Sequence, residues 1–250
     1  MAPRDLFADR RWRWAAVALA TVVILLLLIA EFFPFGMLKP SLERDWSRRV
    51  GRPVTIGSVR RETAFSFTPT LIIRDVRVPQ PAWAGKGDLA TISRGAVRFN
   101  VFSALFGTFR LRSIAITGLR LALVRDAKGR ENWRSVGPAN GEGANWDLDR
   151  LELSDAQVSY RDAVQDRRAQ LILLADRRHG VSARGTGTIW GHPVAITARG
   201  PAITDAAARW PFQAQITGNA VGISIEGLMA HPLDTGHVTA DITAHAATSS

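Results

Sequence analysis

The stretch LALVRDAKGREN, which precedes Trp133, places two arginines, one lysine, two carboxylates and one asparagine after a leucine-rich run. Carboxylates beside bases could perform general acid–base chemistry, which requires a desolvated pair with shifted pKa values. Asp126 and Gly129, however, hold the first and fourth positions of DAKG, which favours a type I turn followed by a left-handed glycine. A hairpin tip is normally in contact with water, so this cluster is interpreted as a charged turn.

The same Arg-Asp pair recurs in VSYRDAVQDRR, where Arg161 and Asp162 end another alternating segment. A catalytic site is rarely duplicated at successive tips, whereas charged tips keep strands soluble and discourage edge pairing. The chain also lacks the G-x-S-x-G, G-x-x-x-x-G-K-[ST] and H-E-x-x-H patterns. The sequence therefore indicates a non-enzymatic protein without catalytic residues.

Metal and thiol chemistry is also disfavoured. The chain has no cysteine, which excludes thiol nucleophiles, zinc ribbons, iron–sulfur ligation and disulfides. The five histidines are scattered without tight ligand spacing. We expect neither a metal site nor a cofactor.

Composition describes a basic chain with enough apolar residues for a core. Of 250 residues, 46% are hydrophobic, and 32 lysines and arginines against 22 acids give a formal charge of +10. Such a charge suits nucleic acid, anionic lipid or acidic polysaccharide. The cellular compartment decides among these partners.

The N-terminal segment predicts that compartment. Residues 14–30 carry no charge and the apolar run resumes after Glu31, which gives roughly the 20 residues that a bilayer core demands. We therefore expect a retained signal anchor over residues 14–36. The residues that carry this prediction are Trp14, Leu25, Leu26, Leu27, Leu28, Phe32 and Phe33. Arginines crowd residues 1–13, so that segment is predicted to be cytoplasmic and the bulk exported.

In a bacterium this topology corresponds to a single-pass inner-membrane protein with a periplasmic bulk. Nucleic acid is then not an expected partner, and anionic lipid remains. Residues 37–51 follow as a short amphipathic helix in which Leu38, Leu42, Trp46 and Val50 form one stripe. This helix could lie on the bilayer or cap the following strands.

From residue 52 to residue 250 the apolar period changes to two, which is typical of half-buried antiparallel strands. No ten-residue helical pattern lies between the strand-like runs, so parallel βαβ architecture is disfavoured. The Gly/Asn-rich residues 137–145 are predicted to form a loop. The expected fold is mostly β, with a long, twisted, antiparallel sheet.

Three strand-like runs share an irregularity. Their apolar residues alternate, slip by one position at Asp75, Gly118 or Asp155, and then alternate again. A one-residue slip would move the apolar set to the other face unless a β-bulge absorbs the extra residue. We predict bulges at these three positions, with the apolar side kept on one face.

A one-sided apolar sheet without helices must either close into a sandwich or curl around a foreign apolar object. Lipid acyl chains are such an object near a membrane, since burial of one methylene contributes about 0.8 kcal/mol. An open β-groove would then be lined by the alternating residues. The candidates are Leu71, Ile73, Val97, Phe99, Val101, Ile114, Ile116, Leu119, Leu121, Leu151 and Leu153.

The anchor, the short helix, GRPVTIGSV, PTLIIRDVRVPQPAWAG and the run from Val97 to Trp133 together resemble the N-terminal part of the AsmA family. These are inner-membrane-anchored periplasmic proteins related to TamB and to chorein-type bridge-like lipid transporters. The resemblance covers roughly residues 10–165. It implies a taco-like, repeating β-groove fold, phospholipid as ligand, a role in lipid transport and outer-membrane assembly, and no catalytic residues.

Family members are usually longer, and this chain stops in mid-pattern at DITAHAATSS. We therefore expect a fragment, a short paralogue, or one segment that needs a partner at its open edge. The alternative function is a periplasmic scaffold or assembly factor with a closed β core that binds outer-membrane or periplasmic assembly proteins. An anchored hydrolase is a third, weaker alternative.

Overall fold

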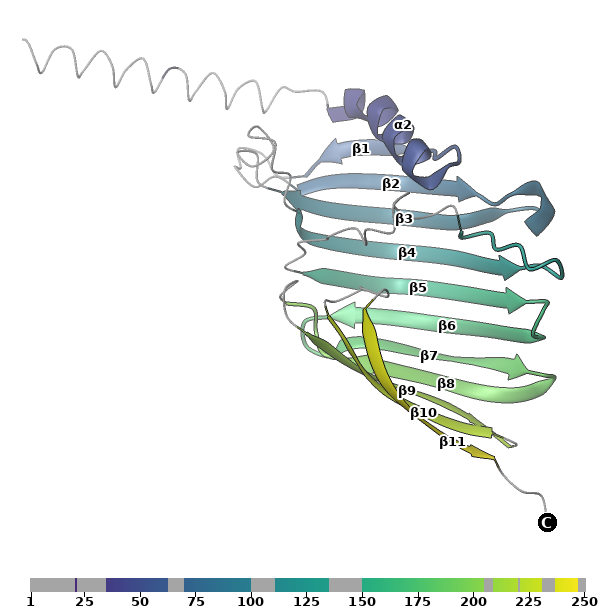
Figure 1. The fold of residues 1–250 in the computed structure, drawn as a ribbon. Helices are drawn as coiled ribbons and strands as arrows, with labels where there is room; N and C mark the ends of the chain where they lie inside the picture. The colour runs from purple at the N-terminus through teal and green to yellow at the C-terminus, as the bar shows by residue number, and fades with distance from the viewer. Residues whose placement is uncertain are drawn as a thin grey trace, which may run out of the picture.

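The computed structural model describes residues 21, 35–62, 70–99, 111–134, 150–204, 209–219, 221–230 and 237–246, and these residues are mostly β (Figure 1). The helical elements are η1 (Phe35–Leu38), α2 (Lys39–Val50) and η2 (Ala82–Ala84). The strands are β1 (Ser58–Arg61), β2 (Thr70–Pro79), β3 (Asp88–Phe99), β4 (Leu111–Arg125), β5 (Leu151–Asp162), β6 (Arg167–Asp176), β7 (Gly180–Ile189), β8 (His192–Gly200), β9 (Trp210–Gly218), β10 (Val221–Met229) and β11 (Val238–Ala246).

All eleven strands form one sheet in which the spatial order is the sequence order, from β1 to β11. The sheet is open, with β1 and β11 at its two edges. It twists along its length, so that β9–β11 run obliquely to β2–β4 (Figure 1). The predicted mostly β, open architecture is confirmed.

The prediction of an antiparallel sheet is wrong at one pair, because β4 and β5 are parallel while every other neighbouring pair is antiparallel. The DAKG turn forms as predicted, since the amide of Gly129 donates to the carbonyl of Asp126 at 2.9 Å and Gly129 has φ +76°. After this turn, however, the pairing with β4 is limited to a single bridge between Arg125 and Glu131 in the described residues. β5 then begins beside Ile114, near the start of β4. The predicted loop 137–145 lies outside the described residues.

Of the three predicted bulges, the register shows one, at Asp155, where β5 has one residue more than β6 between the Leu153–Ala175 and Ala156–Leu173 pairs. At Asp75 and Gly118 the prediction of a bulge is wrong, because the register is the same before and after each residue and Ser93 stands opposite both. Asp75, Gly118 and Asp155 all adopt the left-handed conformation, with φ values of +54°, +69° and +48°. Ser93 of β3 lies in the same row, between the paired positions on β2 and β4. We call Asp75, Ser93, Gly118 and Asp155 the crease. It ends at β6, where two residues of β5 oppose a single residue.

A compact core lies at the β1 end of the sheet, where α2 packs in front of β1 and β2 (Figure 1). Its buried members are Val54, Ile56, Val59, Ile73 and Val76, and Leu42, Trp46 and Val50 of α2 pack against them. The predicted stripe of the helix therefore caps the strands, which is one of the two roles expected for it.

Trp14, Leu25, Leu26, Leu27, Leu28, Phe32 and Phe33 lie outside the described residues. Within the described residues, no helix has the length and hydropathy needed to cross a bilayer.

Candidate functional site

The cross-strand register sorts the side chains onto two faces, because residues directly opposite each other on neighbouring strands share a face. Leu71 of β2 stands opposite Val97 of β3, which stands opposite Ile114 of β4 and then Leu151 of β5. A second row runs through Ile73, Gly95, Ile116, Leu153 and Ala175. We call the face that carries these rows the apolar face.

On the other side of the crease from these two rows, the apolar residues of the strands still project from the apolar face. Val76 pairs with Ile92 and Ile92 with Leu119, so the slip at Asp75 and Gly118 does not invert the sheet. Leu121 then starts a row that crosses the rest of the sheet through Val158, Leu171, Gly185, Ile196, Ile216, Ile223 and Ala244. The sequence-based list of groove residues stops at β5 and misses this part, although its strands show the same alternation.

The apolar face is the crowded, concave side of the sheet. On β6, Leu171 and Leu173 belong to the apolar face and are half-buried. Ile172 and Leu174 of the same strand project from the other face and are 62% and 41% exposed. Residues of equal size on one strand differ in this way when neighbouring side chains converge on one side and diverge on the other.

Coverage of the apolar face is uneven. Near β1 it is sealed by α2, and Ile73, a predicted groove residue, lies buried at 4% exposure in that core. Among the residues within 35–246 that the structure describes, α2 is the only α-helix and all strands belong to one sheet, so no second sheet lies over the face. At β11, Ile242 of the apolar face is 68% exposed. The face is therefore closed at its β1 end, half-buried across the middle strands and exposed at the edge strand β11.

The remaining predicted groove residues are brought together on this face, half-buried, across β2–β5. They are Leu71, Val97, Ile114, Ile116, Leu119, Leu121, Leu151 and Leu153. The side chain of Phe99 and the whole of Val101 lie outside the described residues. The register thus unites the candidates, and lipid contact stays a prediction for each of them.

The opposite face is polar and basic, and we call it the polar face. Thr117, Ser154, Arg120 and Gln157 alternate with the apolar residues of β4 and β5. Arg120 crosses to the crease, where its guanidinium donates to the Asp155 carbonyl at 2.6 Å and to both carboxylate oxygens at 3.1 Å. A hollow of about 660 Å³ on this face is lined by both polar and apolar residues of β3–β7. The basic charge of the chain is therefore carried largely away from the apolar face.

The charged pair Arg161–Asp162 corrects one expectation. Asp162 was predicted to lie at a wet tip, but it is only 1% exposed. Its Oδ1 accepts hydrogen bonds from the amides of Val164 and Gln165 at 2.9 and 3.1 Å, and its Oδ2 accepts one from the Tyr160 hydroxyl at 3.1 Å. Sequence spacing cannot show this burial, because the partners of Asp162 include Arg125 on the neighbouring strand β4 as well as Tyr160 of β5 and the turn that follows it.

These contacts shift the pKa values of the buried pair in opposite directions. Desolvation raises the pKa of Asp162, but the two backbone amides, the Tyr160 hydroxyl and Arg125 outweigh it and hold that pKa below its usual value. Burial, followed by the hydrogen bond to Asp162, raises the pKa of Tyr160. The carboxylate is thus held ionised beside a neutral phenol, a bonding pattern suited to fixing the turn.

The opening cluster is likewise a fixed turn. Asp126 Oδ1 accepts from the amides of Lys128 and Arg130 at 3.0 and 2.9 Å, and the Arg130 guanidinium lies 4.7 Å from the ring centroid of Trp83. Desolvation opposes ionisation of Asp126, but the side-chain and backbone hydrogen bonds from Arg130 lower its pKa. Among the described residues, no three metal-ligating groups lie close enough to hold an ion. The arrangement supports a structural role for this turn.

Fold and site define a class of protein: an open, single-layer β-sheet whose concave face is apolar and whose other face is basic. The chain belongs to the AsmA family, whose model matches residues 10–240. No curated protein and no solved structure matches the chain.

Proposed function

We propose that this protein is a non-enzymatic lipid carrier that shields phospholipid acyl chains on the apolar face. It is held by its N-terminal segment in the bacterial inner membrane and works in the periplasm towards outer-membrane assembly. Family membership is consistent with this role. The observation that carries the proposal is the apolar face itself, which crosses the sheet while α2 covers only its β1 end among the described residues.

The energetic argument concerns the side chains that remain half-exposed. Four such side chains share the apolar face on β6, β8 and β9: Leu171, Leu173, Ile196 and Ile216. A soluble protein rarely exposes an apolar patch of several hundred Å² unless the patch binds something. Acyl chains suit such an apolar surface, because each methylene removed from water contributes about 0.8 kcal/mol to the free energy of binding and no specific geometry is needed.

The test uses two neighbours on β6 that face opposite ways. A photo-crosslinking residue is placed at Leu171 on the apolar face or at Ile172 on the polar face, in the full chain within native membranes. We expect phospholipid adducts at position 171 and few at position 172, measured by mass spectrometry. Equal labelling at both positions, or none at position 171, refutes lipid binding on this face.

The alternative function is an assembly factor that has a closed β core and binds partner proteins. The closed core is excluded because the sheet is open, and the binding of a partner protein is retained as a second proposal. The observation in its favour is the outer edge of β11. The Ala230 amide bonds the His237 carbonyl, so by alternation the backbone groups of Val238, Ala240 and Ile242 point away from β10. An extended segment of a partner protein could add a strand there.

Proline at position 240 tests this alternative because it removes one outward donor and leaves the β10 pairing intact. Ala240→Pro should abolish capture of a periplasmic partner, and Ala240→Ser, which keeps the amide, should not. Retained capture in the proline variant contradicts strand addition at this edge.

A further inference from the structure

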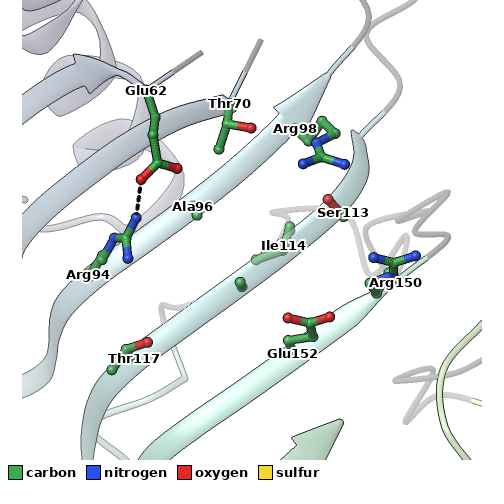
Figure 2. Close-up of a pocket in the computed structure, with 11 residues that line it drawn as sticks. Glu62, Thr70, Arg94, Ala96, Arg98, Ser113, Ile114, Thr117, Arg150 and Glu152 are labelled. Carbon is green, nitrogen blue, oxygen red and sulfur yellow. Dashed lines mark hydrogen bonds and ion pairs between the residues drawn. The ribbon is translucent and has the colours of Figure 1, made fainter. Parts of the chain in front are cut away.

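We infer that the polar face carries a binding site for a phosphate ester of a small polyol, built by Arg98, Ser113, Arg150 and Glu152. These residues line a hollow of about 270 Å³ at the ends of β3–β5 (Figure 2). Its volume lies just below the roughly 300–1,000 Å³ of sites that hold drug-sized ligands. It therefore suits a head-group-sized molecule.

The register brings the two arginines to opposite sides of one hydroxyl. Arg98 is directly opposite Ser113 on the antiparallel β3–β4 pair. The Ile114 amide bonds the Arg150 carbonyl at 3.0 Å, which places Arg150 beside Ser113 on the other side. Figure 2 shows Ser113 between the two arginines. Two strand spacings separate their Cα atoms by roughly 10 Å, so both guanidinium groups can reach one anion between them.

The floor of the hollow is made of small side chains. Ala96 is opposite Ala115, and Ala115 is beside Glu152 across the parallel pair. Two neighbouring alanines leave space that longer polar side chains would fill on this face. The arginines therefore border an open hollow rather than a packed surface.

The charge pattern selects an anion. In the part of the chain that the structure describes, Arg98 and Arg150 form no ion pair, whereas Arg94 at the opposite end of the hollow bonds Glu62 at 2.7 Å. Guanidinium groups bind phosphate oxygens with paired, charge-assisted hydrogen bonds. The unpaired arginines thus supply the donors for a phosphate, and the Ser113 hydroxyl adds another.

Glu152 narrows the ligand class. A carboxylate accepts hydrogen bonds and repels a bare anion, so its presence next to the arginines disfavours inorganic phosphate. The hydroxyl groups of a glycerol or sugar attached to the phosphate would donate to Glu152. The same chemistry belongs to a soluble polyol phosphate and to a glycerol-containing lipid head group.

The experiment measures binding to the full chain in mild detergent by calorimetry, with glycerol 1-phosphate and inorganic phosphate as soluble probes. We expect R98Q/R150Q to bind glycerol 1-phosphate at least about tenfold more weakly, the usual effect of losing a charge-assisted hydrogen bond. The matched control is R161Q/R168Q, which removes two exposed, directly opposed arginines elsewhere on the polar face. This control should change binding less than about twofold, since it alters only the overall charge.

Glu152→Gln separates the polyol from the phosphate. It should weaken glycerol 1-phosphate binding and strengthen inorganic phosphate binding, whereas a purely electrostatic patch would bind both probes more tightly.

Vesicles of phosphatidylcholine with and without phosphatidylglycerol identify the source of the ligand. Binding to the phosphatidylglycerol vesicles alone, lost in R98Q/R150Q and kept in R161Q/R168Q, assigns the site to a lipid head group. The proposal is overturned if neither the soluble probes nor the anionic vesicles bind, or if the two double variants lose binding equally.

Discussion

The crease gives the sharpest test of the fold, through two glycines that share a backbone conformation and differ in surroundings. Gly118 and Gly129 have φ values of +69° and +76°. A Cβ at Gly129 would meet no atom within 4 Å, whereas a Cβ at Gly118 would lie 2.4 Å from Ser93 Oγ and 2.8 Å from Ser93 Cβ. Alanine therefore brings the same backbone strain at both positions and a steric clash at only one.

The magnitudes follow from these distances. Left-handed backbone costs a non-glycine residue roughly 1–2 kcal/mol, which is the whole expected effect of Gly129→Ala. The contact at Gly118 is with a Cβ as well as with a rotatable hydroxyl, so the strands must shift, and overpacking of this kind costs about 1–3 kcal/mol more. We expect Gly118→Ala to destabilise the protein by roughly 2–5 kcal/mol.

The assay is urea unfolding of the full chain in mild detergent, combined with a double-mutant cycle. Ser93→Gly removes both clashing atoms, so in that background Gly118→Ala should cost no more than Gly129→Ala does. If Gly118→Ala is as mild as Gly129→Ala in the wild-type background, or if Ser93→Gly gives no relief, the row of residues that forms the crease is wrongly placed.

Three further changes test the rest of the framework. Trp46→Ala should lower the free energy of unfolding by about 2 kcal/mol, less than for a fully buried tryptophan, because Trp46 is half-buried against the core at the β1 end; an unchanged urea midpoint would mean that α2 does not cap the sheet. Asn132 is 0% exposed and bonds the Val124 amide and the Ala122 carbonyl at 2.9 Å each, so Asn132→Ala should cost about 2–3 kcal/mol and speed hydrogen exchange at Val124; slow exchange there would contradict this bonding. Because the folded pKa of Asp162 is lowered, its stabilisation is present above the unfolded value of about 3.9 and is lost as pH falls through the folded value. Asp162→Asn should thus lower the melting temperature at neutral pH and converge with the wild type near pH 2, and parallel profiles would argue against an ionised Asp162.

Local patterns predicted much of this fold. Alternation located the strands, and the phase slips located three residues with positive φ, Asp75, Gly118 and Asp155, because a local change of backbone conformation keeps the apolar side chains on one face. The sequence could not show that neighbouring strands slip together at Asp75 and Gly118, so that only Asp155 forms a bulge. The turn at Asp126–Gly129 was likewise predictable, since its residues determine its backbone angles.

Non-local features were not predictable in the same way. Alternation is identical in parallel and antiparallel strands, so the parallel β4–β5 pair has no signature in the sequence. The burial of Asp162 depends on Tyr160 and the following turn closing over it, while its position among charged residues suggests exposure. The pair Arg98 and Arg150 was missed because 52 positions separate its members in the chain and only the register unites them.

The two edges of the sheet differ, and the difference has a consequence for size. β1 is short and is flanked by a helix, whereas β11 presents nine residues of backbone along its outer side. Each strand pairs only with its neighbours in sequence. A hairpin added past β11 would therefore lengthen the sheet by roughly 10 Å without altering the pairing of any earlier strand. In such an architecture the length of the sheet is set by the number of strands, and the sheet can be extended only at its β11 edge.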